Sequence, residues 1–281
     1  MPEKPVTATG YPGEVAELVR ATCLYVASRL GDIMDDLVVI GGLVPSLLIR
    51  QDPLPEGVDA HVGTLDLDIG LTLTLLDEGR YRTLSERLRR AEFAPDVNEQ
   101  GRPTRQRWAL EELNGVTVDF LIPPSRPGDR GGTLRDIEPD FAAVIAPGLH
   151  LAFRDREKVT LAGRTIMGEE ATRDVWVSGP GAYVVLKSLA FRSRGENKDA
   201  YDLYYVVRHY GVGVEEVVSR LVPLLGDQAA LQALEILRED FLAHDSVGPR
   251  RVAEFLHGMP DDVVQADVVG FVGRLLDLCK P

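Results

Sequence analysis

Three aspartates lie in segments whose other residues are typical of buried β-strands. Asp66 and Asp68 belong to the run GTLDLDI, and Asp119 belongs to VTVDFL. Residues two apart on a strand point to the same face, so we expect the carboxylates of Asp66 and Asp68 side by side. Two carboxylates that close repel each other and need a cationic partner. Oxygen ligands suit Mg²⁺, with Mn²⁺ as the alternative, and Asp119 could complete the cluster from a neighbouring strand.

The composition indicates a soluble globular protein with one large domain or two ordinary ones. The chain has 281 residues, of which 44% are hydrophobic and 27% are charged. It contains no run of 18 uncharged apolar residues, and its first twenty residues lack an apolar signal core. The cysteines, Cys23 and Cys279, are too few and too far apart in sequence for a disulfide framework. We therefore expect a cytoplasmic protein without a membrane partner.

The charge is strongly negative overall but uneven along the chain. A net charge of −13 argues against a surface built for nonspecific nucleic-acid binding. One segment nevertheless gathers eight arginines: Arg80, Arg82, Arg87, Arg89, Arg90, Arg102, Arg105 and Arg107. This segment could contact a phosphate-rich partner, and the alternative is a solvated helix face followed by a polar loop.

The hydrophobic pattern predicts an α+β fold, with a mixed β-sheet domain over 1–130 and connecting strands and a helical domain over 131–281. Helical spacing of apolar residues is found at 13–30, 43–50, 78–91, 180–192, 198–210, 213–222, 227–243, 250–257 and 261–279. Strand patterns are found at 37–40, 65–74, 104–110, 116–122, 158–161 and 164–167. Asn114-Gly115 and Ala162-Gly163 are the expected turns between the last four of these strands.

Two further motifs accompany the aspartates. Gly41-Gly42 follows the strand pattern at 37–40 and precedes a helix. A Gly-Gly at the start of a helix, then Asp-x-Asp on one strand and a lone Asp on another, resembles the nucleotidyltransferase superfamily with the DNA-polymerase-β-like fold. The segments VWVSGP, LKSLAFR and KDAYDLY, which begin at residues 175, 186 and 198, resemble the pattern of AbiEii-type toxins. These are the nucleotidyltransferase partners in certain bacterial toxin–antitoxin pairs. The resemblance spans residues 37–210.

The resemblance implies a reaction and a role for each acid. A hydroxyl attacks the α-phosphorus of a nucleoside triphosphate and pyrophosphate leaves, so positioning and cations carry most of the catalysis. By motif, Asp66 and Asp68 would bind two Mg²⁺ ions. Asp119 would bind the catalytic metal and help deprotonate the acceptor hydroxyl.

A second group of residues would bind the nucleotide. Gly41 and Gly42 let the backbone approach the triphosphate, and the amides of the following helix face the anion. The family more often has Gly-Ser here, whose hydroxyl touches a phosphate, and Ser46 is the candidate to replace it. Thr64 would orient the carboxylates or a phosphate.

Lys187 lies in an apolar helical segment, where an unpaired ammonium is costly to bury. The resemblance assigns it to the triphosphate, which would neutralise it. Asp199 and Asp202 are three apart on the next helix and share a face, so one of them could contact Lys187, the nucleotide or the acceptor. The alternative for this pair is surface salt bridges with nearby basic residues. His61 has no ligand spacing and is interpreted as structural or exposed.

Three functions follow as alternatives. The leading hypothesis is a metal-dependent nucleotidyltransferase that adds nucleotides to an RNA acceptor, with the tRNA 3′ end as the first candidate, as the toxin partner of an antitoxin protein. The second keeps the chemistry but has a small hydroxylated acceptor, as in antibiotic-modifying relatives. The third is an inactive relative that binds a nucleotide or a partner protein.

Overall fold

The structure is a computed structural model that describes residues 4–51, 54, 59–72, 78–98, 100–110 and 116–280. The chain forms two compact units. The sheet unit lies within residues 13–44 and 63–178, and the helical unit lies within 4–12, 45–62 and 179–281. The expected α+β class, with a helical region after a mixed sheet, is confirmed. The boundary placed at 130/131 from sequence lies inside the sheet unit, because the strands from 134 to 178 join the same sheet.

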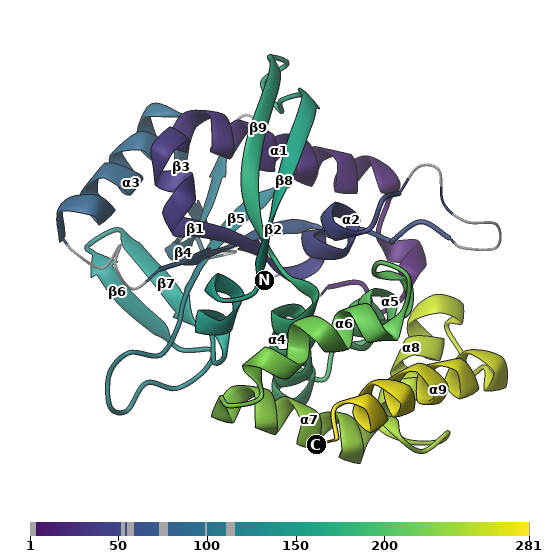
Figure 1. The fold of residues 1–281 in the computed structure, drawn as a ribbon. Coiled ribbons are helices and arrows are strands. Elements are labelled where there is room, and N and C mark those ends of the chain that lie inside the picture. Colours follow the sequence, from purple (N-terminus) through teal and green to yellow (C-terminus); the bar gives the residue numbers. More distant parts are fainter. Residues whose placement is uncertain are drawn as a thin grey trace. The chain divides into compact units, whose positions relative to one another are not determined.

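The described strands form one nine-stranded mixed sheet with the order β3-β4-β5-β2-β1-β9-β8, to which β7 adds beside β5 and β6 beside β7 (Figure 1). Their bounds are β1 Leu37–Ile40, β2 Asp66–Leu71, β3 Phe93–Val97, β4 Pro103–Leu110, β5 Thr117–Ile122, β6 Leu134–Glu138, β7 Phe141–Ile145, β8 Arg156–Arg164 and β9 Glu170–Ser178. β2 runs antiparallel to β1 and parallel to β5. The short strand β1 is fully buried and reads LVVI, as expected for the centre of a sheet.

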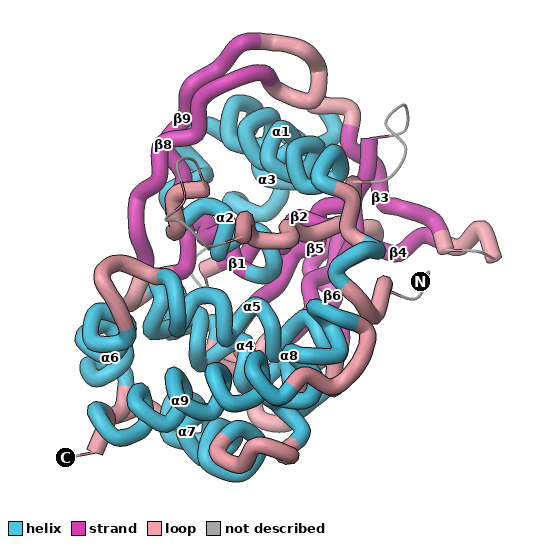
Figure 2. The backbone as a smooth tube through the Cα atoms, turned by 90° about the vertical axis from the view of Figure 1, so that its right-hand side faces the viewer, coloured by secondary structure: helices cyan, strands magenta, loops and turns pink. Residues whose placement is uncertain are grey.

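Two helices of the sheet unit lie side by side against the sheet (Figures 1 and 2). α1, Gly13–Leu30, buries an apolar face that includes Val19, Cys23 and Leu30, and the chain leaves it through Gly31 at φ +57. α3 spans Glu78–Arg90 and packs beside it. Both helices agree with the sequence pattern, because each buries apolar residues at helical spacing, Leu84 and Leu88 in α3.

The sequence pattern was less successful for the strands that follow. β3, β6, β7 and β9 were not predicted, because charged residues, proline or alanines interrupt the apolar pattern in each. The strand expected at 164–167 is wrong except for Arg164, the last residue of β8. The hairpin turn expected at Ala162-Gly163 is wrong: both residues lie inside β8, and the turn falls at Thr165–Glu169. Gly168 adopts φ +80 there and donates its amide to Thr165, so it supplies the conformation that the turn requires. The turn expected at Asn114-Gly115 lies outside the described residues, although β4 and β5 pair antiparallel as predicted.

Every described regular element after β9 is helical (Figure 2). The helices are α4 Pro180–Arg194, α5 Asn197–His209, α6 Val214–Leu221, α7 Gln228–Phe241, α8 Val247–His257 and α9 Asp262–Leu278. α4 packs against α5, α6 and α7, while α5 also packs against α8 and α9. Pro180 begins α4 and Gly195, at φ +68, ends it, so both boundaries follow the usual helix signals. The short helix α2, Val44–Leu48, belongs to this unit from Pro45 onward.

The described cysteines are separate free thiols, and both are buried. Burial raises the pKa of Cys23 to about 12, so this thiol is a core residue rather than a nucleophile. Among the helices in the described part of the chain, none has the length and apolar character needed to cross a membrane.

Candidate metal centre and a buried charge network

Asp66, Asp68 and Asp119, here called the acidic triad, converge within the sheet unit. β2 and β5 are adjacent parallel strands whose register places Asp68 directly beside Asp119. Asp66 lies two residues before Asp68, so its side chain is on the same face. One carboxylate oxygen from each residue lies within 4.8 Å of the others. The expected convergence of the three acids is therefore present.

The donor set fits a hard divalent cation. Oxygens bound to one Mg²⁺ at about 2.1 Å lie at most about 4.2 Å apart, so the 4.8 Å spread needs a small side-chain adjustment. Asp66 is buried, whereas Asp68 and Asp119 are partly exposed, which leaves one side open for water or a phosphate ligand. All three donors are carboxylates, which suits Mg²⁺ or Mn²⁺ better than the softer metals.

Gly41 shapes the position of Asp68. It begins the 3₁₀ turn Gly41–Leu43 at φ +73, directly after Ile40, which pairs with Asp68 across the sheet. A Cβ atom at residue 41 would lie 1.9 Å from the Oδ2 atom of Asp68. The backbone can pass the carboxylate this closely because glycine has no side chain. Gly42 is buried in the same turn.

Thr64 fixes the first acid of the triad. Its hydroxyl donates a hydrogen bond to Oδ1 of Asp66 at 3.1 Å, and both side chains are buried. Thr64 was expected to orient either the carboxylates or a phosphate, and this hydrogen bond is a contact with a carboxylate.

Arg107 is a member of the site that the sequence placed elsewhere, among the arginines of a possible RNA surface. It lies on β4 directly opposite Asp119 in the antiparallel register. Its Nε donates to Oδ1 of Asp119 at 2.7 Å and its Nη2 to Oδ2 at 2.5 Å. The hydrogen bond to Asp119 raises the pKa of Arg107 above its ordinary value. The guanidinium is therefore a permanent cation inside the candidate centre.

Other arginines of the 80–107 segment also pair with acids of the sheet unit. The pairs, with their N–O distances, are Arg87–Asp32 at 2.6 Å, Arg89–Asp140 at 2.6 Å, Arg90–Glu86 at 3.6 Å and Arg105–Asp136 at 2.8 Å. Each pair offsets a positive charge that the sequence alone suggested was available to phosphates. The surface of this segment therefore carries much less uncompensated positive charge than its sequence suggests.

The second group of candidate residues forms a buried charge network in the helical unit. The Nζ atom of Lys187 on α4 lies 2.9 Å from Oδ1 of Asp199 and 2.7 Å from Oδ2 of Asp202, both on α5. Arg194 also binds Asp199, and Lys198 binds Asp202 at 2.5 Å. The side chains of Asp199 and Asp202 are at most 1% exposed, so the surface salt bridges considered as an alternative are instead buried ones.

In this network, opposite charges offset the cost of burying each ion. Burial by itself would lower the pKa of Lys187, but the charges of Asp199 and Asp202 outweigh it and hold this pKa well above its usual value. Burial would likewise raise the pKa of Asp199, yet Lys187 and Arg194 lower it to about 2. The sequence argument that Lys187 needs a triphosphate to be buried therefore no longer holds, because two carboxylates neutralise it.

Ser46 is connected to this network through His61, which sequence reasoning did not single out. The Nδ1 atom of His61 lies 2.9 Å from the Ser46 hydroxyl, and its Nε2 lies 2.9 Å from Oδ1 of Asp202. Burial lowers the pKa of His61 to about 4, so the ring is neutral near pH 7. An ionised Asp202 can only accept, so Nε2 carries the proton and Nδ1 accepts from Ser46. The Ser46 hydroxyl thus donates its proton to His61. Because a phosphate oxygen needs a donor, this hydroxyl offers a phosphate only its lone pairs.

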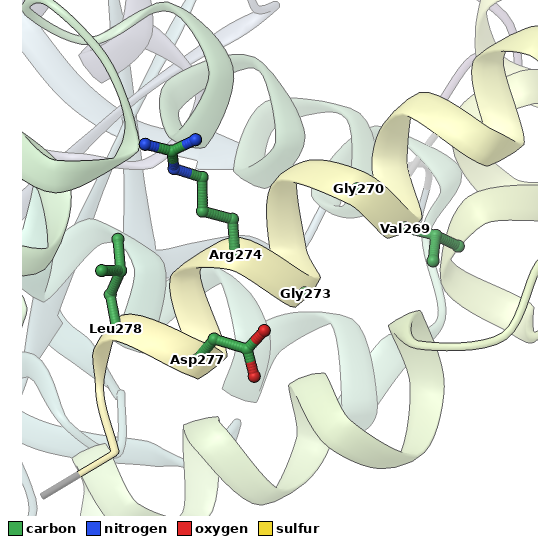
Figure 3. Close-up of a pocket in the computed structure, with 6 residues that line it drawn as sticks. All are labelled: Val269, Gly270, Gly273, Arg274, Asp277 and Leu278. Atoms are coloured by element: carbon green, nitrogen blue, oxygen red, sulfur yellow. The ribbon is translucent and has the colours of Figure 1, made fainter.

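A hollow of about 610 Å³ lies along α9 in the helical unit (Figure 3). Its lining residues are Val269, Gly270, Gly273, Arg274, Asp277 and Leu278. Arg274 pairs with Glu215, and Asp277 pairs with Lys280. The hollow therefore lacks the convergent, desolvated charges that distinguish the acidic triad.

The chain was compared with known families and with curated proteins, and no family model and no curated protein matches it.

Proposed function

We propose that this protein is a metal-dependent nucleotidyltransferase that transfers a nucleoside monophosphate from a nucleoside triphosphate to a hydroxyl acceptor. The observation that carries the proposal is the convergence of Asp66, Asp68 and Asp119 within 4.8 Å on adjacent strands. The glycine turn at Gly41 supports it, because it brings the main chain close to Asp68, one of the candidate metal ligands. The resemblance of the 37–210 segment to AbiEii-type toxins motivates the choice of reaction.

Each residue of the triad would have a distinct part. Two metal ions, Mg²⁺ or Mn²⁺, would share Asp66 and Asp68 as ligands, and Asp119 would bind the catalytic one. Thr64 holds Asp66 by a hydrogen bond, and Asp68 lies against Gly41. A divalent cation bound there would supply positive charge to the phosphate oxygens and would lower the barrier to the departure of pyrophosphate. The triad thereby fixes the position of the triphosphate relative to the attacking hydroxyl.

Two classes of acceptor are candidates for this reaction. An RNA end such as the tRNA 3′ terminus is the first candidate, by the resemblance given above. The pairing of Arg87, Arg89, Arg90 and Arg105 with acids of the same unit favours a second candidate, a small hydroxylated molecule, because it removes much of the positive charge that RNA phosphates would need.

The test is label transfer. The protein is incubated with Mg²⁺ and each α-³²P-labelled nucleoside triphosphate, with total tRNA in one series and with cationic hydroxylated small molecules in another. We expect label to enter one of the two acceptor classes. The rate of transfer should fall by at least about a hundredfold in Asp66→Asn, which removes a charged ligand without changing side-chain size.

Asp174→Asn is the matched control, because Asp174 is an exposed aspartate on β9 of the same sheet. Its transfer activity should equal that of the unmodified protein. Transfer that persists in Asp66→Asn would show that the triad is not the centre. Absence of transfer to every acceptor, together with binding of a nucleotide, would favour the inactive relative.

A further inference from the structure

Arg107 is placed to interact with more than one member of the acidic triad. The Nη2 atom that donates to Oδ2 of Asp119 at 2.5 Å also lies 3.9 Å from Oδ2 of Asp66. The guanidinium is therefore on the side of Asp119 that faces the other candidate ligands. Its side chain is 10% exposed, so this position is enclosed by protein rather than by water.

The contact is of the strong type. Two parallel hydrogen bonds join the guanidinium fork to both oxygens of Asp119, an arrangement that Arg makes and Lys does not. The charges of Asp66 and Asp68 add to the stabilisation of the charged guanidinium. Three carboxylates within 4.8 Å would repel one another strongly without a cation. Arg107 is a cation that the described structure provides in direct contact with Asp119, with its Nη2 atom 3.9 Å from Asp66.

A guanidinium and a divalent metal ion cannot both use the same carboxylate edge without mutual repulsion, which is strong at such distances in a partly buried site. We propose that Arg107 is an internal counterion of the triad, which stabilises the cation-free protein, and that a divalent cation binds by displacing it from Asp119. The proposal rests on the proposed metal function of the triad. It deepens that function, because metal affinity becomes adjustable through one residue that is not a ligand.

Two opposite effects of removing Arg107 follow. Arg107→Gln lowers the thermal stability of the metal-free protein, because the three carboxylates lose their cation. The same change tightens metal binding, because the competitor is gone. If Arg107 instead held Asp119 in its metal-binding position, its removal would weaken metal binding, so the sign of the change in affinity separates a counterion from a support.

The experiment measures Mn²⁺ affinity by isothermal titration calorimetry on the full-length protein, without nucleotide. We expect Arg107→Gln to lower the Kd by on the order of tenfold to a hundredfold. Arg107→Lys keeps the charge but loses the fork, and should fall between the two. Arg105→Gln is the matched control: it removes a neighbouring, more exposed arginine that pairs with Asp136, and should leave the Kd unchanged.

A second measurement follows the guanidinium in the unmodified protein. In the ¹⁵N-labelled unmodified protein, the Nε–H signal of Arg107, assigned by its absence in Arg107→Lys, should shift toward that of a solvent-exposed guanidinium as Mg²⁺ is added. An unchanged signal at saturating Mg²⁺, or a Kd that is equal or higher in Arg107→Gln, would overturn the counterion role while leaving the metal site intact. Absence of Mn²⁺ binding in every form would instead overturn the metal function itself, and the counterion role with it.

Discussion

Replacing Gly41 by alanine tests how the glycine turn positions the acidic triad. The added Cβ atom would lie 1.9 Å from Oδ2 and 2.7 Å from Cγ of Asp68. Because the turn follows directly on the buried strand β1, whose register with β2 is fixed by four residue pairs, the backbone has little freedom to retreat. The side chain of Asp68 must therefore give way.

Asp68 has to move by about 1.5 Å to regain an ordinary van der Waals separation from the new methyl group. Such a shift removes its oxygen from the cluster. Since even outer-shell changes cost about 10–100-fold in metal affinity, we expect a loss on the order of a hundredfold. Holding alanine at φ +73 costs a further ~1–2 kcal/mol of folding stability.

Gly132→Ala separates the collision from the backbone strain. Gly132 has φ +78, nearly the same as Gly41, but a Cβ atom there meets nothing within 4 Å. Both variants should lose similar stability in urea unfolding, whereas Mn²⁺ titration should show weakened binding in Gly41→Ala alone. Equal Mn²⁺ affinity in the two variants would refute the reasoning that Gly41 places Asp68.

Two further predictions concern the buried charge network. Lys187→Met should destabilise the protein by about 3 kcal/mol, because Asp199 and Asp202 lose a buried partner; urea unfolding measures this. The second concerns pH: the folded-state pKa of His61 is about 4, below its ordinary 6.5, so the unfolded chain binds a proton that the folded one does not. The contribution of His61 to the free energy of unfolding is fully present above pH 6.5. It falls by about 3 kcal/mol in all as the pH decreases to 4, and His61→Gln should remove this part of the pH dependence of stability.

Two further residues of the same unit set the comparison for these predictions. Lys280→Met removes an exposed lysine that pairs with Asp277 and should change the free energy of unfolding by less than about 1 kcal/mol. His209 also has its pKa lowered to about 4 by burial, so some pH dependence should survive in His61→Gln. A Lys187→Met variant as stable as Lys280→Met, or a pH slope unaltered by His61→Gln, would contradict the buried network as described.

Local pattern was sufficient for much of the fold. The helices α1, α3 and α4 to α9 were predicted close to their observed bounds, because each is long and repeats apolar residues at helical spacing over several turns. Asp66 and Asp68 could be assigned to one face from their separation alone, because alternation on a strand is a local property. In β3, β6, β7 and β9, charged residues, proline or alanines interrupt such a pattern, and pairing with neighbouring strands defines these strands instead.

The partners of the charged residues depended on tertiary structure. Sequence placed Asp119 on a strand, but the register of β5 against β2 puts it beside Asp68. The register of β4 makes Arg107, a candidate RNA contact by sequence, the ion-pair partner of Asp119. His61 and Asp202 are 141 residues apart, so nothing local could pair them. The sequence by itself determined which groups are ionisable and which elements carry them. Which charge compensates which is decided by strand register and helix packing, because electrostatic partners are set by distance in space and not along the chain.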